Sequence, residues 1–225
     1  MIYYFLKRLV DLLLASIAFI ILSPFLIIIV IILLFTGEGE VFYLQERLGF
    51  KNKKFKIIKF ATMLKNSPEI GTGSLTLRGD PRVLPFGRFL RKSKINELPQ
   101  IFNVIIGNMS IVGPRPQMQI DFDKFPVDKR NEIYKSQPGI TGIGSIIFRD
   151  EEKWISNFSG DKHKFYKEKI APYKAELEIW YYQNQSVFID FKLIFLTAWV
   201  IVFPSSNIVN NVLKSLPKKP SHLEN

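Results

Sequence analysis

The segment Leu12 to Thr36 carries no charged residue in 25 positions, and this run constrains the fold more than any other feature of the chain. About 20 consecutive apolar residues suffice for a helix to cross a bilayer. A core helix in a chain of 225 residues would show a polar face, and this run has none. A signal peptide has an apolar region of only about 7–15 residues and a small-residue cleavage site, which GEGEVFYLQ does not resemble. The sequence therefore predicts a membrane-inserted helix that stays in the mature protein.

The pair Ser23-Pro24 interrupts the middle of this run. Proline removes a backbone hydrogen bond and bends a helix, and Ser23 is placed to satisfy the carbonyl that is freed. Positive residues mark the cytoplasmic side of a membrane segment. Here both flanks are basic, with Lys7 and Arg8 before the run and KNKKFKIIK (51–59) after it. Two topologies follow: a re-entrant helix hairpin that returns to the same face, and a straight span with a mild kink.

The formal net charge of +11 favours negatively charged partners. Because the basic residues are dispersed and adjoin the apolar segments, anionic lipid headgroups are the expected partner and nucleic acid is not. The absence of cysteine excludes disulfides, thiol catalysis and cysteine metal sites. His163 and His222 lack metal-ligand spacing and are expected to be solvated.

Periodicity predicts an α+β, mainly helical fold in three parts: the membrane helix (1–36), a membrane-associated domain (37–203) and a polar, disordered tail (204–225). VFYLQERLG and FKIIKFATM are typical of two strands joined by a turn between Gly49 and Lys54. The stretch from Leu84 to Lys92 predicts a basic amphipathic helix, which lies on the membrane surface or packs on the core.

A second helix is predicted from Asn96 to Asn108, with Asn96 as its N-cap, Pro99 in its first turn and Gly107 near its end. Further on, a glycine-rich loop (137–144) precedes a predicted strand from Ser145 to Phe148. Residues 151–185 are predicted to be mostly helical. The uncharged piece 193–203 is too short to span a bilayer and is expected at its interface.

Glu97 stands at a predicted helix start, with arginines and glycine turns nearby. Helix N-termini attract anions, and Arg91, Arg115 and Arg149 are candidates to clamp phosphate oxygens. Mg²⁺ is usually held by one or two carboxylates plus substrate phosphates, so Glu97 is the candidate metal ligand. A helix cap with a nearby salt bridge explains the same residues equally well.

Several patterns occur together and in order: KRLVD (7–11), SP within the apolar run, VFYLQERLG with FKIIKFATM, DPRVLPFGRFLRK (80–92), NELPQIFNVIIGNMSIVGPRP, QPGITG and YYQNQSVFIDFKLIFLT (181–197). Together they resemble the bacterial sugar transferase family, the monotopic polyprenyl-phosphate phosphoglycosyl transferases. The resemblance covers roughly residues 1–200.

The resemblance implies transfer of a phosphosugar from a UDP-sugar to undecaprenyl phosphate, with release of UMP and a requirement for Mg²⁺. The product starts a lipid-linked glycan for an exopolysaccharide, capsule, O-antigen or protein glycan, on which downstream glycosyltransferases act. It also implies a re-entrant helix hairpin broken at Ser23-Pro24. The small domain, with amphipathic interfacial helices and a short β-hairpin, then lies on the cytoplasmic face of the bacterial inner membrane. The motifs name neither the sugar nor an oligomeric state.

Carried over by position, Lys59, Arg91, Arg115 and Arg149 contact phosphates, and Pro114 and Pro116 fix the turn that carries Arg115. The family has an Asp-Glu pair where this chain has Asn96-Glu97. The Asp is the covalent nucleophile and the Glu binds the metal.

Three departures from the family pattern are visible: Asn96, Ala61 where an arginine is usual, and GITGIGSIIFRD, which leaves the match of Arg149 open by a residue or more. An amide cannot form an aspartyl-phosphate intermediate. Three hypotheses follow: direct attack by undecaprenyl phosphate, another nucleophile with Glu97 as first candidate, or a catalytically impaired scaffold or substrate binder. The retained Glu97, Arg91, Lys59 and GPRP turn favour an active transferase with a modified mechanism.

Overall fold

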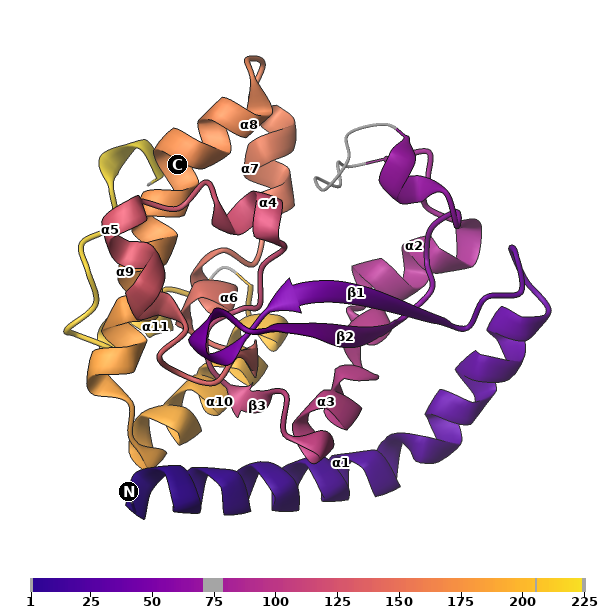
Figure 1. Ribbon diagram of the computed structural model, residues 1–225, viewed down its shortest axis with the longest axis horizontal. Helices are drawn as coiled ribbons and strands as arrows, with labels where there is room; N and C mark the ends of the chain where they lie inside the picture. The colour runs from indigo at the N-terminus through magenta and orange to yellow at the C-terminus, as the bar shows by residue number, and fades with distance from the viewer. Residues whose placement is uncertain (1, 71–78, 205, 224–225) are drawn as a thin grey trace.

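The computed structural model describes residues 2–70, 79–204 and 206–223, and within them it is mainly helical, as predicted, with two small sheets (Figure 1). The glycine, serine, proline and charged residues of the stretch 65–82 predict a loop, which lies partly outside the described residues. The α-helices are α1 (Ile2–Leu34), α2 (Pro85–Lys92), α3 (Gln100–Ile106), α4 (Gln119–Phe122), α5 (Val127–Ile133), α6 (Ile143–Ile147), α7 (Glu151–Asn157), α8 (Lys162–Phe165), α9 (Ala171–Asn184), α10 (Val187–Val202) and α11 (Ile208–Val212). A π-helical turn (Tyr166–Ile170) joins α8 to α9, and short 3₁₀ turns cover Phe50–Asn52, Ser67–Glu69, Ile95–Glu97 and Ser221–Leu223.

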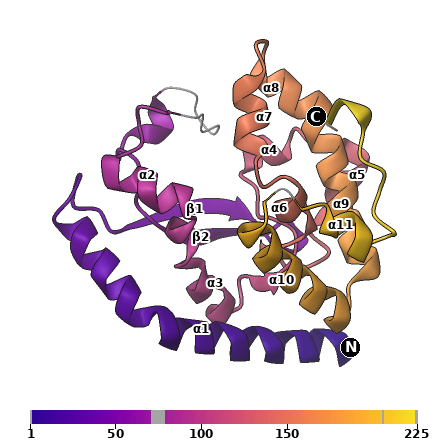
Figure 2. The ribbon, with the colours of Figure 1, turned by 180° about the vertical axis from the view of Figure 1, so that it is seen from behind.

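Helix α1 runs along one side of the domain and changes direction part-way, which Figures 1 and 2 show from opposite sides. Pro24 lies inside it, and its missing N–H leaves the carbonyl of Ile20 without its helical donor. The hydroxyl of Ser23 donates to that carbonyl at 2.9 Å. The proposed role of Ser23 is thus confirmed, and the chain bends without leaving the helix.

One helix among the described residues, α1, is long and apolar enough to cross a membrane. Its outer surface exposes large apolar side chains, which include Ile2, Phe5, Leu9, Leu13, Ile17, Ile20, Ile21, Phe25, Ile27, Ile28, Ile31 and Leu34, and Phe35 follows just after the helix. A patch of this extent is unfavourable in water and marks a surface that contacts lipid or protein.

The predicted β-hairpin is confirmed. Strand β1 (Phe42–Leu48) pairs antiparallel with β2 (Lys54–Phe60), and Phe42 lies opposite Phe60. Helix α3 is attached to the free edge of β2 by Asn103, whose side chain accepts from Ile58 N at 2.9 Å and donates to Lys56 O at 2.8 Å. The hairpin and α3 thereby form one unit that rests on α1 (Figure 1).

A second sheet consists of β3 (Ser110–Val112) and β4 (Gly139–Thr141), which are parallel. The strand predicted from Ser145 to Phe148 is wrong, because the chain pairs with β3 earlier and then enters α6. Two glycines allow the close approach of the segments: a Cβ on Gly113 would lie 2.0 Å from the backbone oxygen of Gln137, just before β4, and a Cβ on Gly139 would lie 2.1 Å from Gly113 N. The sequence motifs GPRP and QPGITG are therefore the two halves of one contact.

The C-terminal helices form the largest core, in which Tyr134, Leu177 and Leu193 are fully buried. The segment after Pro204 differs from the disordered tail that its polarity predicted. It carries α11, and Leu213 and Leu223 are buried against the same core. A few apolar residues spaced along a polar segment suffice to dock it, since each buried leucine contributes roughly 1.5–3 kcal/mol.

Candidate phosphate-binding site

Asn96 is not the N-cap of a helix, so this prediction is wrong. Lys94 adopts a left-handed conformation with φ 61°, and the chain then makes a 3₁₀ turn over Ile95–Glu97. Because Pro99 occupies the cap position of α3, no side chain caps this helix. The side chain of Asn96 is instead buried, and its Oδ1 has no hydrogen-bond partner among the described residues.

Glu97 is the centre of a partly buried charge cluster. Its Oε1 accepts from Lys59 Nζ at 3.0 Å and from Arg115 Nη2 at 2.8 Å, and its Oε2 accepts from Arg115 Nη1 at 3.3 Å. Burial raises the pKa of the Glu97 carboxyl, but the charges of Arg115 and Lys59 outweigh it and hold the pKa well below the usual range. Glu97 is therefore ionised at neutral pH.

Arg47 belongs to this cluster, although it was not singled out from the sequence. Burial, together with the neighbouring charge of Arg115, lowers its pKa to about 10, while the charges of Asp121 and Glu97 oppose the shift. Strand alternation could have predicted the position of Arg47. Tyr43 lies opposite Lys59, and residues 43, 45 and 47 share one face of the strand. Arg47 and Lys59 thus point from neighbouring strands to the same side of the hairpin.

The cluster has an excess of positive charge. Lys59, Arg47 and Arg115 stand against the single carboxylate of Glu97, and Asp121, which also faces Arg47, is paired with Lys124 at 2.9 Å. Burial lowers the pKa of Lys59 to about 8, and Arg47 and Arg115 act in the same direction against Glu97. Such a group gains by binding a multiply charged phosphate, which would relieve the repulsion among the cations.

The backbone of Arg115 is held on both sides. Its N–H points at Glu178 Oε1 at 3.5 Å, and its carbonyl accepts from the Tyr134 hydroxyl at 3.0 Å. Tyr134 also accepts from Gln117 N at 2.8 Å. Pro114 and Pro116, both buried, flank Arg115 in the turn. The predicted role of this turn as a rigid support agrees with these contacts, whereas Tyr134 and Glu178 gave no signal in the sequence.

Two predicted phosphate ligands lie apart from these contacts. Arg149 donates to the carbonyl of Val200 in α10 and pairs with Asp150 at 3.4 Å. This placement accords with the departure of the sequence from the family pattern just before it. Arg91 lies on α2, where its Nη1 is 3.7 Å from the sulfur of Met63.

The site offers oxygen ligands for a metal ion that takes most of its other ligands from the substrate phosphates and water. Within the described part of the chain, no three histidine, aspartate or glutamate side chains gather as a metal cage. Glu97 offers an ionised carboxylate, and the adjacent Asn96 offers a buried, unpartnered oxygen. One carboxylate with substrate phosphates and water is a common set of ligands for Mg²⁺, so these residues fit that ion.

Replacing Glu178 by glutamine is expected to stabilise the protein at alkaline pH. Burial raises the pKa of the Glu178 carboxyl from 4.5 to about 7, against the opposing charges of Lys174 and Arg115. A raised carboxyl pKa means that the folded state holds a proton that the unfolded state has lost, so stability falls as pH rises from 4.5 to 7. Glutamine does not ionise, so the Glu178→Gln variant should keep the free energy of unfolding that wild type loses, which is about 3 kcal/mol above pH 7. Thermal unfolding in detergent at pH 5 and pH 8 measures it, and an equal gain at both pH values would contradict the shift.

Comparison with known proteins places the chain among transferases. A sequence model of the bacterial sugar transferase family matches residues 2–204. The exopolysaccharide production protein ExoY of Sinorhizobium fredii is 32% identical over 206 residues, covering 85% of this chain and 83% of that protein.

Two longer relatives are named for the reaction. The UDP-N-acetylgalactosamine-undecaprenyl-phosphate N-acetylgalactosaminephosphotransferase of Aeromonas hydrophila is 32% identical over 203 residues, 89% of this chain and 44% of that protein. The UDP-glucose:undecaprenyl-phosphate glucose-1-phosphate transferase of Escherichia coli K12 is 32% identical over 198 residues, 86% of this chain and 39% of that protein. The chain thus spans most of the shorter relative and less than half of the two longer ones.

Proposed function

The chain belongs to the bacterial sugar transferase family, and on that premise we propose that it transfers a sugar phosphate from a UDP-sugar to undecaprenyl phosphate and releases UMP. The product would start a lipid-linked glycan, with exopolysaccharide as the first candidate because of the ExoY relative. One observation carries the proposal: Glu97 is fixed between Arg115 and Lys59 in a partly buried, cation-rich cluster of a domain that lies along a long apolar helix.

The residues of the cluster have distinct roles in this reaction. Both substrates carry phosphate charge, so Arg115, Lys59 and Arg47 would neutralise the diphosphate and the lipid phosphate as they approach. Glu97 would hold Mg²⁺, with the amide oxygen of Asn96 beside it as a further donor. The ion, when bound, withdraws charge from the phosphate oxygens. The turn clamped by Tyr134 keeps the guanidinium of Arg115 in place while the negative charge shifts to the leaving UMP.

The domain would lie on the cytoplasmic face of the bacterial inner membrane, with α1 as a re-entrant helix. In support, both halves of α1 pack on the same domain: Ala15 near Ile101, and Leu33 near Phe60 and Leu90. A straight span would carry one half away from the domain across the bilayer. The basic residues at both flanks agree with two ends on the cytoplasmic side.

Single-cysteine labelling is expected to place both ends of α1 on one side. The chain has no cysteine, so Ile2→Cys and Glu40→Cys each introduce the only thiol at an exposed position. A membrane-impermeant maleimide should label both variants in inverted vesicles and neither in intact spheroplasts. Labelling of the two positions from opposite sides would contradict the re-entrant arrangement.

Release of UMP tests the reaction itself. Detergent-solubilised protein is mixed with Mg²⁺, undecaprenyl phosphate and each of a panel of UDP-sugars, and UMP is measured. We expect UMP with at least one sugar and only when the lipid phosphate is present. No UMP from any sugar would favour the alternative, a non-catalytic scaffold or substrate binder, which the names of the relatives do not support.

A further inference from the structure

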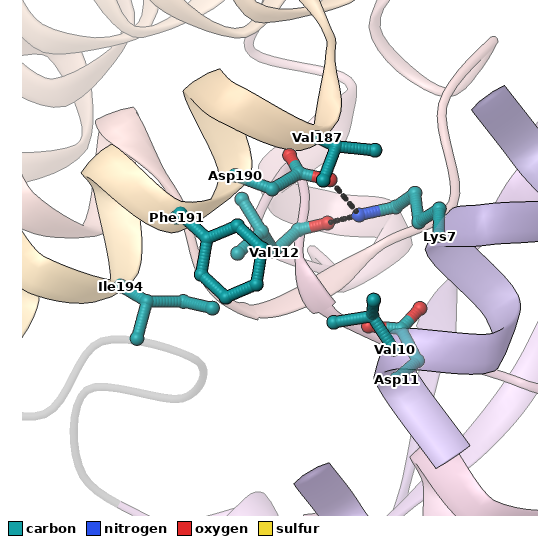
Figure 3. A pocket seen from close by; sticks show the side chains of 8 residues that line it. All are labelled: Lys7, Val10, Asp11, Val112, Val187, Asp190, Phe191 and Ile194. Atoms are coloured by element: carbon teal, nitrogen blue, oxygen red, sulfur yellow. Dashed lines mark hydrogen bonds and ion pairs between the residues drawn. The ribbon is translucent and has the colours of Figure 1, made fainter. Parts of the chain in front are cut away.

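A buried polar cluster joins the N-terminal half of α1 to β3 and α10 (Figure 3). The ammonium of Lys7 donates to the carbonyl of Val112 at 2.8 Å and to Asp190 Oδ2 at 2.9 Å. The side chains of Lys7 and Asp190 are only 8% and 11% exposed. Tyr181 completes the cluster, because its hydroxyl donates to Asp190 Oδ1 at 2.7 Å.

Asp11, one turn after Lys7, makes a second contact with the same strand. Its Oδ1 accepts from the backbone N–H of Ile111 at 2.9 Å. Helix α1 therefore satisfies one donor and one acceptor of β3, while β4 pairs with the strand through Ser110 and Val112. Strand β3 is held from two sides, once by a strand and once by the side chains of the membrane helix.

These contacts exceed what attachment of α1 requires. Apolar packing of Ala15 near Ile101 and Val104 already joins the helix to the domain. A buried ion pair adds little net stability, because the cost of desolvating two charges offsets their attraction. What the polar contacts add is a fixed position for β3 along the axis of α1.

Strand β3 ends at Val112, and the turn Gly113–Pro116 follows immediately. Arg115 is three residues beyond the carbonyl that Lys7 holds. Its guanidinium meets Glu97 with two hydrogen bonds of 2.8 Å and 3.3 Å. A shift of β3 by a fraction of an ångström would thus be passed through a short, proline-stiffened turn to that contact.

We propose that Lys7 and Asp11 are positioning residues for the transfer reaction: by holding β3 they set the turn that places Arg115 against Glu97. The proposal rests on the proposed function, and it makes α1 a structural part of the active site as well as a membrane anchor. The reacting atoms are not touched by either residue.

The test uses a variant that removes both charges of the pair, Lys7→Met with Asp190→Asn, so that no unpaired charge stays buried. We expect turnover to fall about tenfold while the protein remains in the membrane fraction. Lys7→Arg, which keeps the charge, should recover at least half of the wild-type rate. The matched control is Arg8→Met, because Arg8 donates to Val104 O and Ile105 O in α3 and, among the described residues, makes no hydrogen bond to β3. It should lower the melting temperature without the tenfold loss.

A double-mutant cycle distinguishes an effect that acts through the position of Arg115 from a general destabilisation of the fold. Arg115→Lys keeps the charge but loses the two-pronged geometry, so some turnover should remain. In that background the Lys7→Met/Asp190→Asn change should cost less than twofold, because the geometry it protects is already gone. A further tenfold loss there, an undiminished rate in the charge-free variant, or an equal loss in Arg8→Met would each overturn the proposal.

Hydrogen exchange distinguishes failure of the proposal from failure of the proposed function. It requires no substrate. Amides of residues 110–117 should exchange faster in the charge-free variant than in wild type or in Arg8→Met. If wild type releases no UMP but this exchange pattern is seen, the proposed function fails and the coupling of α1 to the turn stands. Unchanged exchange would overturn the coupling whatever the turnover.

Discussion

Replacing Glu97 by glutamine is expected to lower turnover by about 10³-fold or more, because the change removes the one carboxylate that organises the site. Glu97 accepts from Lys59 and Arg115 and is held ionised by them. Glutamine has nearly the same shape but no charge, so the two cations would repel each other, and an Mg²⁺ ligand would be lost. UMP release at saturating UDP-sugar, with Mg²⁺ and undecaprenyl phosphate, measures the effect.

A matched control is available on the same hairpin that carries Lys59. Glu46 is exposed and pairs with Lys54 at 2.9 Å, on the opposite face of the strand from the neighbouring Arg47. Glu46→Gln should retain turnover within about twofold, since exposed ion pairs contribute little. If Glu97→Gln retained turnover within the same range, Glu97 would have no part in the mechanism, and the cation cluster would need another function.

The parts of the fold with strong local signals could be predicted from the sequence. The hairpin followed from alternation around a turn, and the second helix from apolar spacing with a left-handed Gly107 at its end. The bend in α1 followed from Pro24, and even the partner of the Ser23 hydroxyl could be anticipated. In each case the residues that determine the structure are neighbours in the chain.

The errors concern contacts between distant segments. Asn96 looked like a cap because caps are local, but Pro99 took that position and the amide was left in the interior. Tyr134, at the end of α5, and Glu178, in α9, hold the backbone of Arg115 at separations that no short motif encodes. The contact of Arg149 with a carbonyl in α10 is likewise one that no short motif encodes.

The geometry of Glu97 bears on how the reaction proceeds without an aspartate at position 96. Both of its oxygens accept from Arg115, and one also accepts from Lys59. A carboxylate stabilised in this way is a weak nucleophile, because attack would break those bonds. Of the two catalytic hypotheses, direct attack by the lipid phosphate therefore agrees better with the site than a covalent step through Glu97.

Replacing Asn96 by aspartate is then expected to create lipid-independent release of UMP. Wild type, acting by direct attack, should give none until undecaprenyl phosphate is added. The side-chain oxygen of Asn96 is buried and has no partner among the described residues, so a carboxylate fits there without breaking a hydrogen bond. The charges of Arg115 and Lys59, which hold the adjacent Glu97 ionised, would also favour ionisation of the new group and so enable it to attack the diphosphate. Rapid-quench measurement without lipid should show a burst approaching about one UMP per enzyme molecule.

The outcomes of this experiment separate the three mechanisms. A burst in the aspartate variant alone, with lipid-dependent turnover in wild type, supports direct attack at a site that can also accommodate a covalent step. A burst in wild type would mean that another group is the nucleophile, and loss of that burst in Glu97→Gln would identify Glu97 despite its hydrogen bonds. Turnover in the aspartate variant with none in wild type would show that Asn96 abolished catalysis. The cation cluster of the wild-type protein would then bind substrate without catalysis, and replacing the amide nitrogen of residue 96 by oxygen would be enough to make the site catalytic.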